Sequence, residues 1–319
     1  MAECGHEGMV KILLRREDVN PDQADTRSGQ TPLSSAAKCG HEGIVRILLQ
    51  REQVNPNTVE NIYGCTPLSW AAWRGEAEVV KILLERKDVN PDQADGKTGR
   101  TPLSWAAEYG HEGIVKMLLE RADVNPDQAD TRQGRTPLSW AASGGYVGIA
   151  EMLLGKTGVN PSQAITKYGE APRLWAAKNG REGIIKMLLE RADVNPNMVE
   201  NKYGCTPLSW AAWRGKAAVV KMLLGRGDVH PNTTDGKYGR TALVWAAWRG
   251  HQGIVKMLLE RKAVRTATQD NKHQTPMALA LSKNHGGVVK ILLERGNVNS
   301  DPADHGSQAS LQSSSRNGG

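Results

Sequence analysis

The sequence has no phenylalanine, only four cysteines and no long apolar run. Without an apolar stretch of about 18 residues, it predicts neither a transmembrane helix nor the apolar core of a signal peptide. The cysteines form no CxxC pair, so we expect reduced thiols and an intracellular protein, cytoplasmic or nuclear.

Motifs for catalysis are also missing. The sequence contains no GxxxxGK[ST] phosphate loop, and Gly-His-Glu-Gly lacks the second histidine of HExxH. Histidine recurs at one position of a long period, so these side chains must lie apart instead of converging on one ion. Their predicted role is that of a helix-start residue packed on a turn. We therefore expect no catalytic residue, metal, cofactor or small-molecule substrate, and the protein is not predicted to be an enzyme.

Acidic residues are slightly fewer than basic residues. Lys and Arg number 41 against 34 Asp and Glu, which gives a formal net charge of +7 and a pI near 9.2. The excess is spread along the chain without a basic run. It predicts a soluble, mildly cationic surface, and an acidic protein partner is the weaker inference.

One stretch, repeated with variations, makes up almost the whole chain. Residues 100–125 read RTPLSWAAEYGHEGIVKMLLERADVN, and Thr-Pro or its remnant recurs every 35 residues, except for a last step of 34. A fixed period of this size predicts stacked supersecondary units. Copying of one unit also explains why tryptophan is frequent while phenylalanine is absent.

Each copy predicts two short helices followed by a long loop. Thr101 is a good N-cap, Pro102 suits the first helical turn, and Gly110 ends the first helix. A second helix starts near His111 and has an apolar face that includes Leu118. Helices of two to three turns are unstable alone, so each must bury its apolar face on neighbouring copies. The sequence predicts an all-α helix-turn-helix repeat solenoid with short hairpin loops.

These residues resemble the ankyrin repeat. TPLSWAAEYGHEGIVKMLLERADVN is similar to the family pattern T-P-L-H-x-A-A-x-x-G-H…V-x-x-L-L…G-A-D-V-N, over about residues 2–299. The resemblance implies partner binding through the hairpin tips and the inward face of the first helix. Serine replaces the family's histidine after Thr-Pro-Leu, which puts its usual cross-repeat hydrogen bonds in question. The NPDQAD and TPLSWAA wording is similar to arrays in fungal multidomain proteins, where repeats often follow a nucleotide-binding NACHT-type domain.

The period divides the chain into three parts. Residues 1–30 form a partial N-terminal repeat, residues 31–299 form eight repeats of about 35 residues, and residues 300–319 are predicted to be a disordered tail. Residues 2–10 match 37–45, so we expect a fragment of a longer array. Two repeats are irregular. One begins at Ala171 without a threonine cap and carries Arg173 where leucine is expected, and the last has Asn284-His285 in place of Gly-His.

The tryptophans fall into two classes. Those that precede Ala-Ala are predicted to be buried; they are Trp70, Trp105, Trp140, Trp175, Trp210 and Trp245. Trp73, Trp213 and Trp248 follow Ala-Ala and should face the concave groove, each with an arginine after it. Such a pair is typical of an interface anchor. The other interpretation is that each ring lies flat on the next helix.

We favour the interface interpretation, and the best patch pairs Trp213-Arg214 with Trp248-Arg249. The candidate partner-binding residues are Trp73, Arg74, Tyr109, Tyr203, Trp213, Arg214, Tyr238, Arg240, Trp248 and Arg249.

The predicted function is a non-enzymatic protein-protein interaction scaffold that binds a protein or peptide partner in the groove. The alternative is the sensor or autoinhibitory repeat region of a NACHT-type multidomain protein. Nucleic-acid binding has the charge and the aromatic residues in its favour but no recognised motif, so we do not expect it. No membrane partner is expected either.

Overall fold

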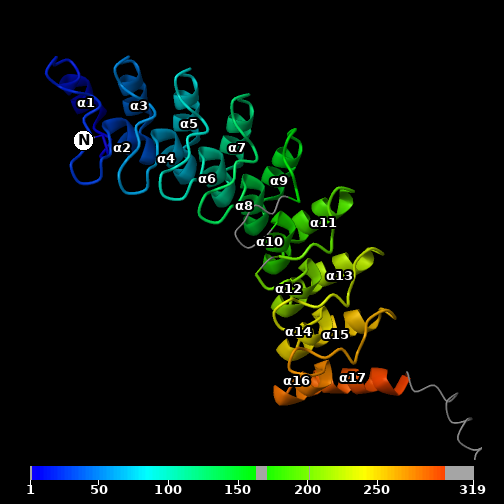
Figure 1. Cartoon of the computed structure of the whole chain (residues 1–319). Coiled ribbons are helices and arrows are strands. Elements are labelled where there is room, and N and C mark those ends of the chain that lie inside the picture. Colours follow the sequence, from blue (N-terminus) through cyan, green and yellow to red (C-terminus); the bar gives the residue numbers. More distant parts are fainter. Residues whose placement is uncertain (1, 163–170, 201, 299–319) are drawn as a thin grey trace, which may run out of the picture. The chain divides into compact units, whose positions relative to one another are not determined.

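The computed structural model describes residues 2–162, 171–200 and 202–298 (Figure 1). These residues contain seventeen helices and no strand, which confirms the predicted all-α repeat solenoid. The chain divides into two compact units, Met1–Pro207 and Leu208–Gly319, and each is described by itself. The predicted tail, 300–319, lies outside the described residues. The division into a partial repeat and eight full repeats stays a prediction.

Each of the eight predicted full repeats contributes a first and a second helix, and the predicted partial repeat contributes a second helix, α1. The first helices are α2 (Pro32–Lys38), α4 (Pro67–Arg74), α6 (Pro102–Tyr109), α8 (Pro137–Gly144), α10 (Pro172–Asn179), α12 (Pro207–Arg214), α14 (Ala242–Arg249) and α16 (Pro276–Ser282). The second helices are α1 (Glu7–Leu13), α3 (Glu42–Leu49), α5 (Ala77–Leu84), α7 (Glu112–Leu119), α9 (Val147–Leu154), α11 (Glu182–Glu190), α13 (Ala217–Gly225), α15 (Gln252–Leu259) and α17 (Gly286–Val298).

Threonine fixes the start of most first helices. The Thr101 hydroxyl oxygen accepts a hydrogen bond from the backbone N–H of Ser104 at 3.2 Å, and the Thr101 hydroxyl donates to Ser104 Oγ at 3.3 Å. The same arrangement recurs at α2, α4 and α8. The serine that stands where the family has histidine therefore has a local, capping role, as predicted for a structural hydroxyl near a helix start.

In each unit, first helices pack on first helices and second helices pack on second helices. In the first unit, α4, α6 and α8 form one row, and α5, α7 and α9 form a second row beside it (Figure 1). In the second unit, α14 packs on α16, and α15 packs on both α13 and α17. Ala106 and Ala107 are fully buried, and their small side chains let neighbouring first helices approach closely.

Helix α10 departs from this pattern. Ala171 provides no side-chain cap, and Arg173 is only 2% exposed at a position that holds leucine in most other first helices. Its Nη1 lies 3.5 Å from Ser162 Oγ, whereas Nε and Nη2 have no hydrogen-bond partner among the described residues. Burial lowers the pKa of Arg173 to about 10, so the side chain is still charged at neutral pH and its desolvation destabilises the first unit there.

Arg173→Leu should therefore stabilise the protein. We expect the free energy of unfolding to rise by about 1–3 kcal/mol, because the change removes a buried charge without a carboxylate partner among the described residues and restores an apolar contact. Urea denaturation followed by circular dichroism measures this change. Lys186→Leu, on the exposed side of α11, is the matched control for added apolar area. A loss of stability in Arg173→Leu would show that the guanidinium has a stabilising partner.

Candidate binding surface on the first helices

Aromatic rings and cationic side chains alternate along the first helices of the first unit. Trp73 lies nearly parallel to two other indoles, with ring centres 4.9 Å from Trp70 and 4.5 Å from Trp105. Offset stacking at such distances stabilises beyond the apolar area that it buries. Trp73 thus bridges α4 and α6.

Arginine takes the place of the bridging ring in the next two repeats. The Arg100 guanidinium lies 4.5 Å from the ring centre of Trp105 and 3.9 Å from that of Trp140. Arg135 lies 4.3 Å from Trp140 and 3.3 Å from Trp175. A planar guanidinium stacks on indole almost as a ring does, so each arginine continues the column.

Lysines lie at both ends of this column. Lys38 Nζ is 4.7 Å from the ring centre of Trp70, and Lys178 Nζ is 4.7 Å from that of Trp175. We call the whole column the ladder. Its members are Lys38, Trp70, Trp73, Trp105, Arg100, Trp140, Arg135, Trp175 and Lys178.

In the first unit, two sequence positions supply the bridging group in alternative ways, whereas one repeat of the second unit carries both groups, Arg240 and Trp248. Where tryptophan follows Ala-Ala, as Trp73 does, the residue before Thr-Pro is Cys65. Where arginine precedes Thr-Pro, as Arg100 does, the residue after Ala-Ala is Glu108, whose carboxylate pairs with that arginine at 2.5 Å. Burial raises the pKa of Glu108, and the nearby guanidiniums of Arg100 and Arg135 oppose this rise. Either residue can fill the space between successive tryptophans.

The tryptophans that precede Ala-Ala are buried in five repeats, as predicted. Trp70, Trp105, Trp140, Trp210 and Trp245 are 3–6% exposed. The sixth, Trp175, differs from the prediction, because it is half-buried.

The tryptophans that follow Ala-Ala are half-buried, not exposed. Trp213 lies between Trp210 and Trp245, with ring centres 4.7 and 5.1 Å away, and Trp248 meets Trp245 edge-on at 5.5 Å. This geometry favours the interpretation in which each ring packs against its neighbours, over the one in which it stands free. The side chains that do face solvent are the arginines that follow them, Arg74, Arg214 and Arg249.

Two of these arginines gather over one indole in the second unit. The Arg214 and Arg249 guanidiniums lie 5.2 and 5.5 Å from the ring centre of Trp213, and Arg249 lies 4.8 Å from Trp248. Neither guanidinium forms an ion pair or a hydrogen bond within the described part of the chain. We call Trp213, Arg214, Trp248 and Arg249 the arginine patch.

Arg240 differs from the patch, although the sequence placed it among the candidates. Its Nε donates to Asp270 Oδ2 at 3.1 Å, and both side chains are largely buried. Burial tends to raise the pKa of Asp270, but hydrogen bonds from the backbone of Gln274 and Lys272 and from Arg240 lower it overall. Arg240 therefore has its counter-ion within the chain.

The candidate tyrosines lie along the same faces. In the first unit, Tyr109 is exposed and its ring centre lies 6.3 Å from that of Trp73. Tyr203, half-buried, also belongs to the first unit and is not grouped with the arginine patch. In the second unit, Tyr238 is exposed and meets Trp245 edge-on at 5.6 Å.

Buried carboxylates hold the hairpins, a role that the sequence analysis missed. Asp235 accepts hydrogen bonds from the backbone N–H groups of Lys237 and Arg240 at 3.0 Å, and from the Trp245 indole at 3.0 Å. Asp130 accepts a hydrogen bond from Trp140 in the same way at 3.2 Å. The sequence does carry a signal for this role. An acidic residue recurs every 35 residues, six positions before the threonine that caps the first helix, as Asp130 does before Thr136.

The histidines link consecutive repeats. His111 Nε2 lies 3.2 Å from the carbonyl oxygen of Trp73, and His251 Nε2 lies 3.3 Å from that of Trp213. His41 and His285 make equivalent contacts to Glu3 and Trp248. The predicted structural role of this column is confirmed. Among the described residues no group of His, Cys, Asp or Glu could hold a metal ion.

The family model for ankyrin repeats, in its three-copy form, matches residues 1–95, 87–165, 158–235 and 228–304. The chain therefore belongs to the ankyrin repeat family, and its repeats indicate a protein-protein interaction module. A comparison with curated proteins finds no match. No helix of the described residues is long and apolar enough to cross a membrane.

Proposed function

We propose that the chain is a non-enzymatic interaction module that binds an acidic segment of a protein partner at the arginine patch. One observation carries this proposal: Arg214 and Arg249 are exposed, lie over the same indole, and have no carboxylate partner within the described residues. Both positive charges lie near the Trp213 ring, so an anionic group of a partner placed there is attracted to both of them.

Two other arginines on these faces already have carboxylate partners within the chain. Arg100 pairs with Glu108 and lies between two rings, and Arg240 pairs with Asp270. A partner carboxylate can form charge-assisted, bidentate hydrogen bonds with the free guanidiniums of Arg214 and Arg249. The half-buried rings of Trp213 and Trp248 supply apolar area beside them. The patch therefore suits a segment that alternates acidic and apolar side chains.

The first unit offers a close control for the patch. Residues 66–75 and 206–215 have the same sequence, TPLSWAAWRG, so Arg74 follows Trp73 as Arg214 follows Trp213. The next repeat differs, because Glu108 and Tyr109 stand where the second unit has Trp248 and Arg249. Arg74 therefore lacks a second arginine, because Tyr109 stands at the position of Arg249 and the half-buried carboxylate of Glu108 stands at that of Trp248.

Arg214→Ala combined with Arg249→Ala tests the proposal. The probe is a fluorescently labelled peptide of alternating glutamate and leucine, measured by fluorescence anisotropy at low salt. We expect binding to weaken by roughly 10- to 30-fold, because two exposed ion pairs contribute up to about 1 kcal/mol each. Added salt should weaken wild-type binding and affect the double variant less.

Arg74→Ala is the matched control and should leave the affinity unchanged. Equal weakening in the control, or equal binding of a peptide with lysine in place of glutamate, would contradict the proposal.

The alternative function, a sensor or autoinhibitory region of a NACHT-type protein, rests only on the resemblance of the NPDQAD and TPLSWAA sequences to such arrays. A P-loop domain in the same reading frame would support it. In that case an acidic surface of that domain would be the natural partner for the arginine patch.

A further inference from the structure

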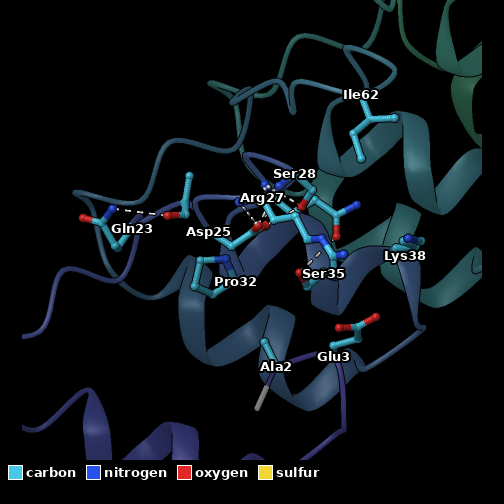
Figure 2. A pocket seen from close by; sticks show the side chains of 12 residues that line it. Ala2, Glu3, Gln23, Asp25, Arg27, Ser28, Pro32, Ser35, Lys38 and Ile62 are labelled. Carbon is cyan, nitrogen blue, oxygen red and sulfur yellow. Dashed lines mark hydrogen bonds between the residues drawn. The ribbon is translucent and has the colours of Figure 1, made fainter.

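An open hollow of about 600 Å³ lies beside α2 in the first unit (Figure 2). Pro32, Ser35 and Lys38 of α2 line it, together with Gln30 from the preceding hairpin. Ile62, from the tip of the next hairpin, also contributes, and its side chain is 47% exposed. The hollow lies at the Lys38 end of the ladder, in the first unit, whereas the arginine patch belongs to the second unit.

The hollow exists because both groups that fill the equivalent space elsewhere are missing. Ser35 stands where six other repeats have tryptophan, and Gln30 stands where the ladder has Arg100 and Arg135. The Ser35 hydroxyl donates to Gln30 Oε1 at 3.4 Å, so these two short polar side chains satisfy each other. Among the residues that line the hollow there is no tryptophan, and the one arginine, Arg27, comes from the hairpin and is not the counterpart of Arg100 or Arg135.

Lys38 has an aromatic ring on one side only. Its Nζ lies 4.7 Å from the ring centre of Trp70, and the residue also lines the hollow. Arg100, by contrast, has Trp105 and Trp140 on its two faces. A ring placed in the hollow would give Lys38 the environment that the ladder arginines already have. The negative face of an aromatic ring is electrostatically complementary to this ammonium group.

We propose that the hollow binds an aromatic side chain, a tryptophan of a protein partner. The indole stacks over Lys38, occupies the place of the tryptophan that Ser35 replaces, and rests one edge on the exposed apolar side chain of Ile62. The partner's ring thus extends the ladder by one member. This site is separate from the arginine patch, so either proposal can fail without the other.

Binding can be measured on the full chain with N-acetyltryptophanamide as the probe. Methyl NMR of isoleucine-labelled protein reports on Ile62. We expect a saturable shift of the Ile62 methyl signal in the millimolar range expected for a ligand of this size, with titration to about 20 mM. N-acetylleucinamide should bind at least about threefold more weakly, because it offers no ring to the ammonium group.

Two variants separate a built site from a surface contact. Ser35→Trp should fill the hollow with the chain's own indole, abolish the Ile62 shift and raise Tm by roughly 2–4 °C. Lys38→Met keeps the aliphatic stem but removes the charge, and it should weaken binding by about threefold or more while the protein stays folded.

Absence of a saturable Ile62 shift in the wild type would overturn the proposal. So would equal binding of both probes, or unchanged binding in Lys38→Met. These three outcomes do not depend on whether Ser35→Trp folds.

Discussion

Trp73→Ala is expected to lower the free energy of unfolding by about 2–4 kcal/mol, although the side chain is only half-buried. The indole stacks on Trp70 in its own helix and on Trp105 in the next, so its loss leaves two ring faces without a partner. Trp70 and Trp105 belong to different repeats, so the loss of the Trp73 ring should weaken the coupling between α4 and α6. Urea denaturation followed by far-UV circular dichroism measures the change, and hydrogen exchange locates it.

The ladder itself provides a rescue experiment. Adding Cys65→Arg and placing glutamate instead of alanine at position 73 recreates the Arg100–Glu108 pair one repeat earlier. We expect this double variant to recover at least about half of the lost stability, because a guanidinium between two indoles replaces the missing ring. Arg74→Ala, on an exposed side chain of the same helix, should change stability by no more than about 0.5 kcal/mol. A Trp73→Ala protein as stable as the wild type would show that the stacking is incidental.

Leu118→Ala should have the largest effect on stability, about 2–5 kcal/mol. Leu118 is 0% exposed in α7, a second helix with neighbours on both sides, so truncation leaves a cavity that its surroundings can only partly close. Because each repeat is stabilised by its neighbours, exchange protection should fall in α5 and α9 as well as in α7.

Lys116→Ala is the control for Leu118→Ala, since its side chain is exposed on the same helix. If only α7 lost protection while α5 and α9 kept theirs, the repeats would be less coupled than the packing indicates.

Local sequence signals predicted the helices well. Thr-Pro at the start and glycine at the end of a first helix act within a few residues, and the structure places α6 at Pro102–Tyr109 between Thr101 and Gly110. The burial of Trp105 followed in the same way from its position before Ala-Ala. Each of these features depends on contacts within one repeat or with an identical neighbour.

The chemistry of the surface was harder to predict, because it depends on residues from different repeats. The environment of Trp73 depends on Trp105, 32 positions later, and the neutralisation of Arg240 depends on Asp270, 30 positions later. Sequence reasoning identified these residues as candidates for binding. It could not show which of these side chains contact a residue of the next repeat and are therefore less available to a partner.

The two-position pattern of the ladder has a consequence for how such an array changes over time. The bridging group lies between two repeats, so the element that determines surface chemistry is the junction and not the repeat. Residues 66–75 and 206–215 are identical, yet they are followed by Glu108 in one case and by Trp248 in the other. Recombination that moves whole repeats keeps every helix intact but creates new junctions at its breakpoints. New surfaces can therefore arise in this chain without any point mutation.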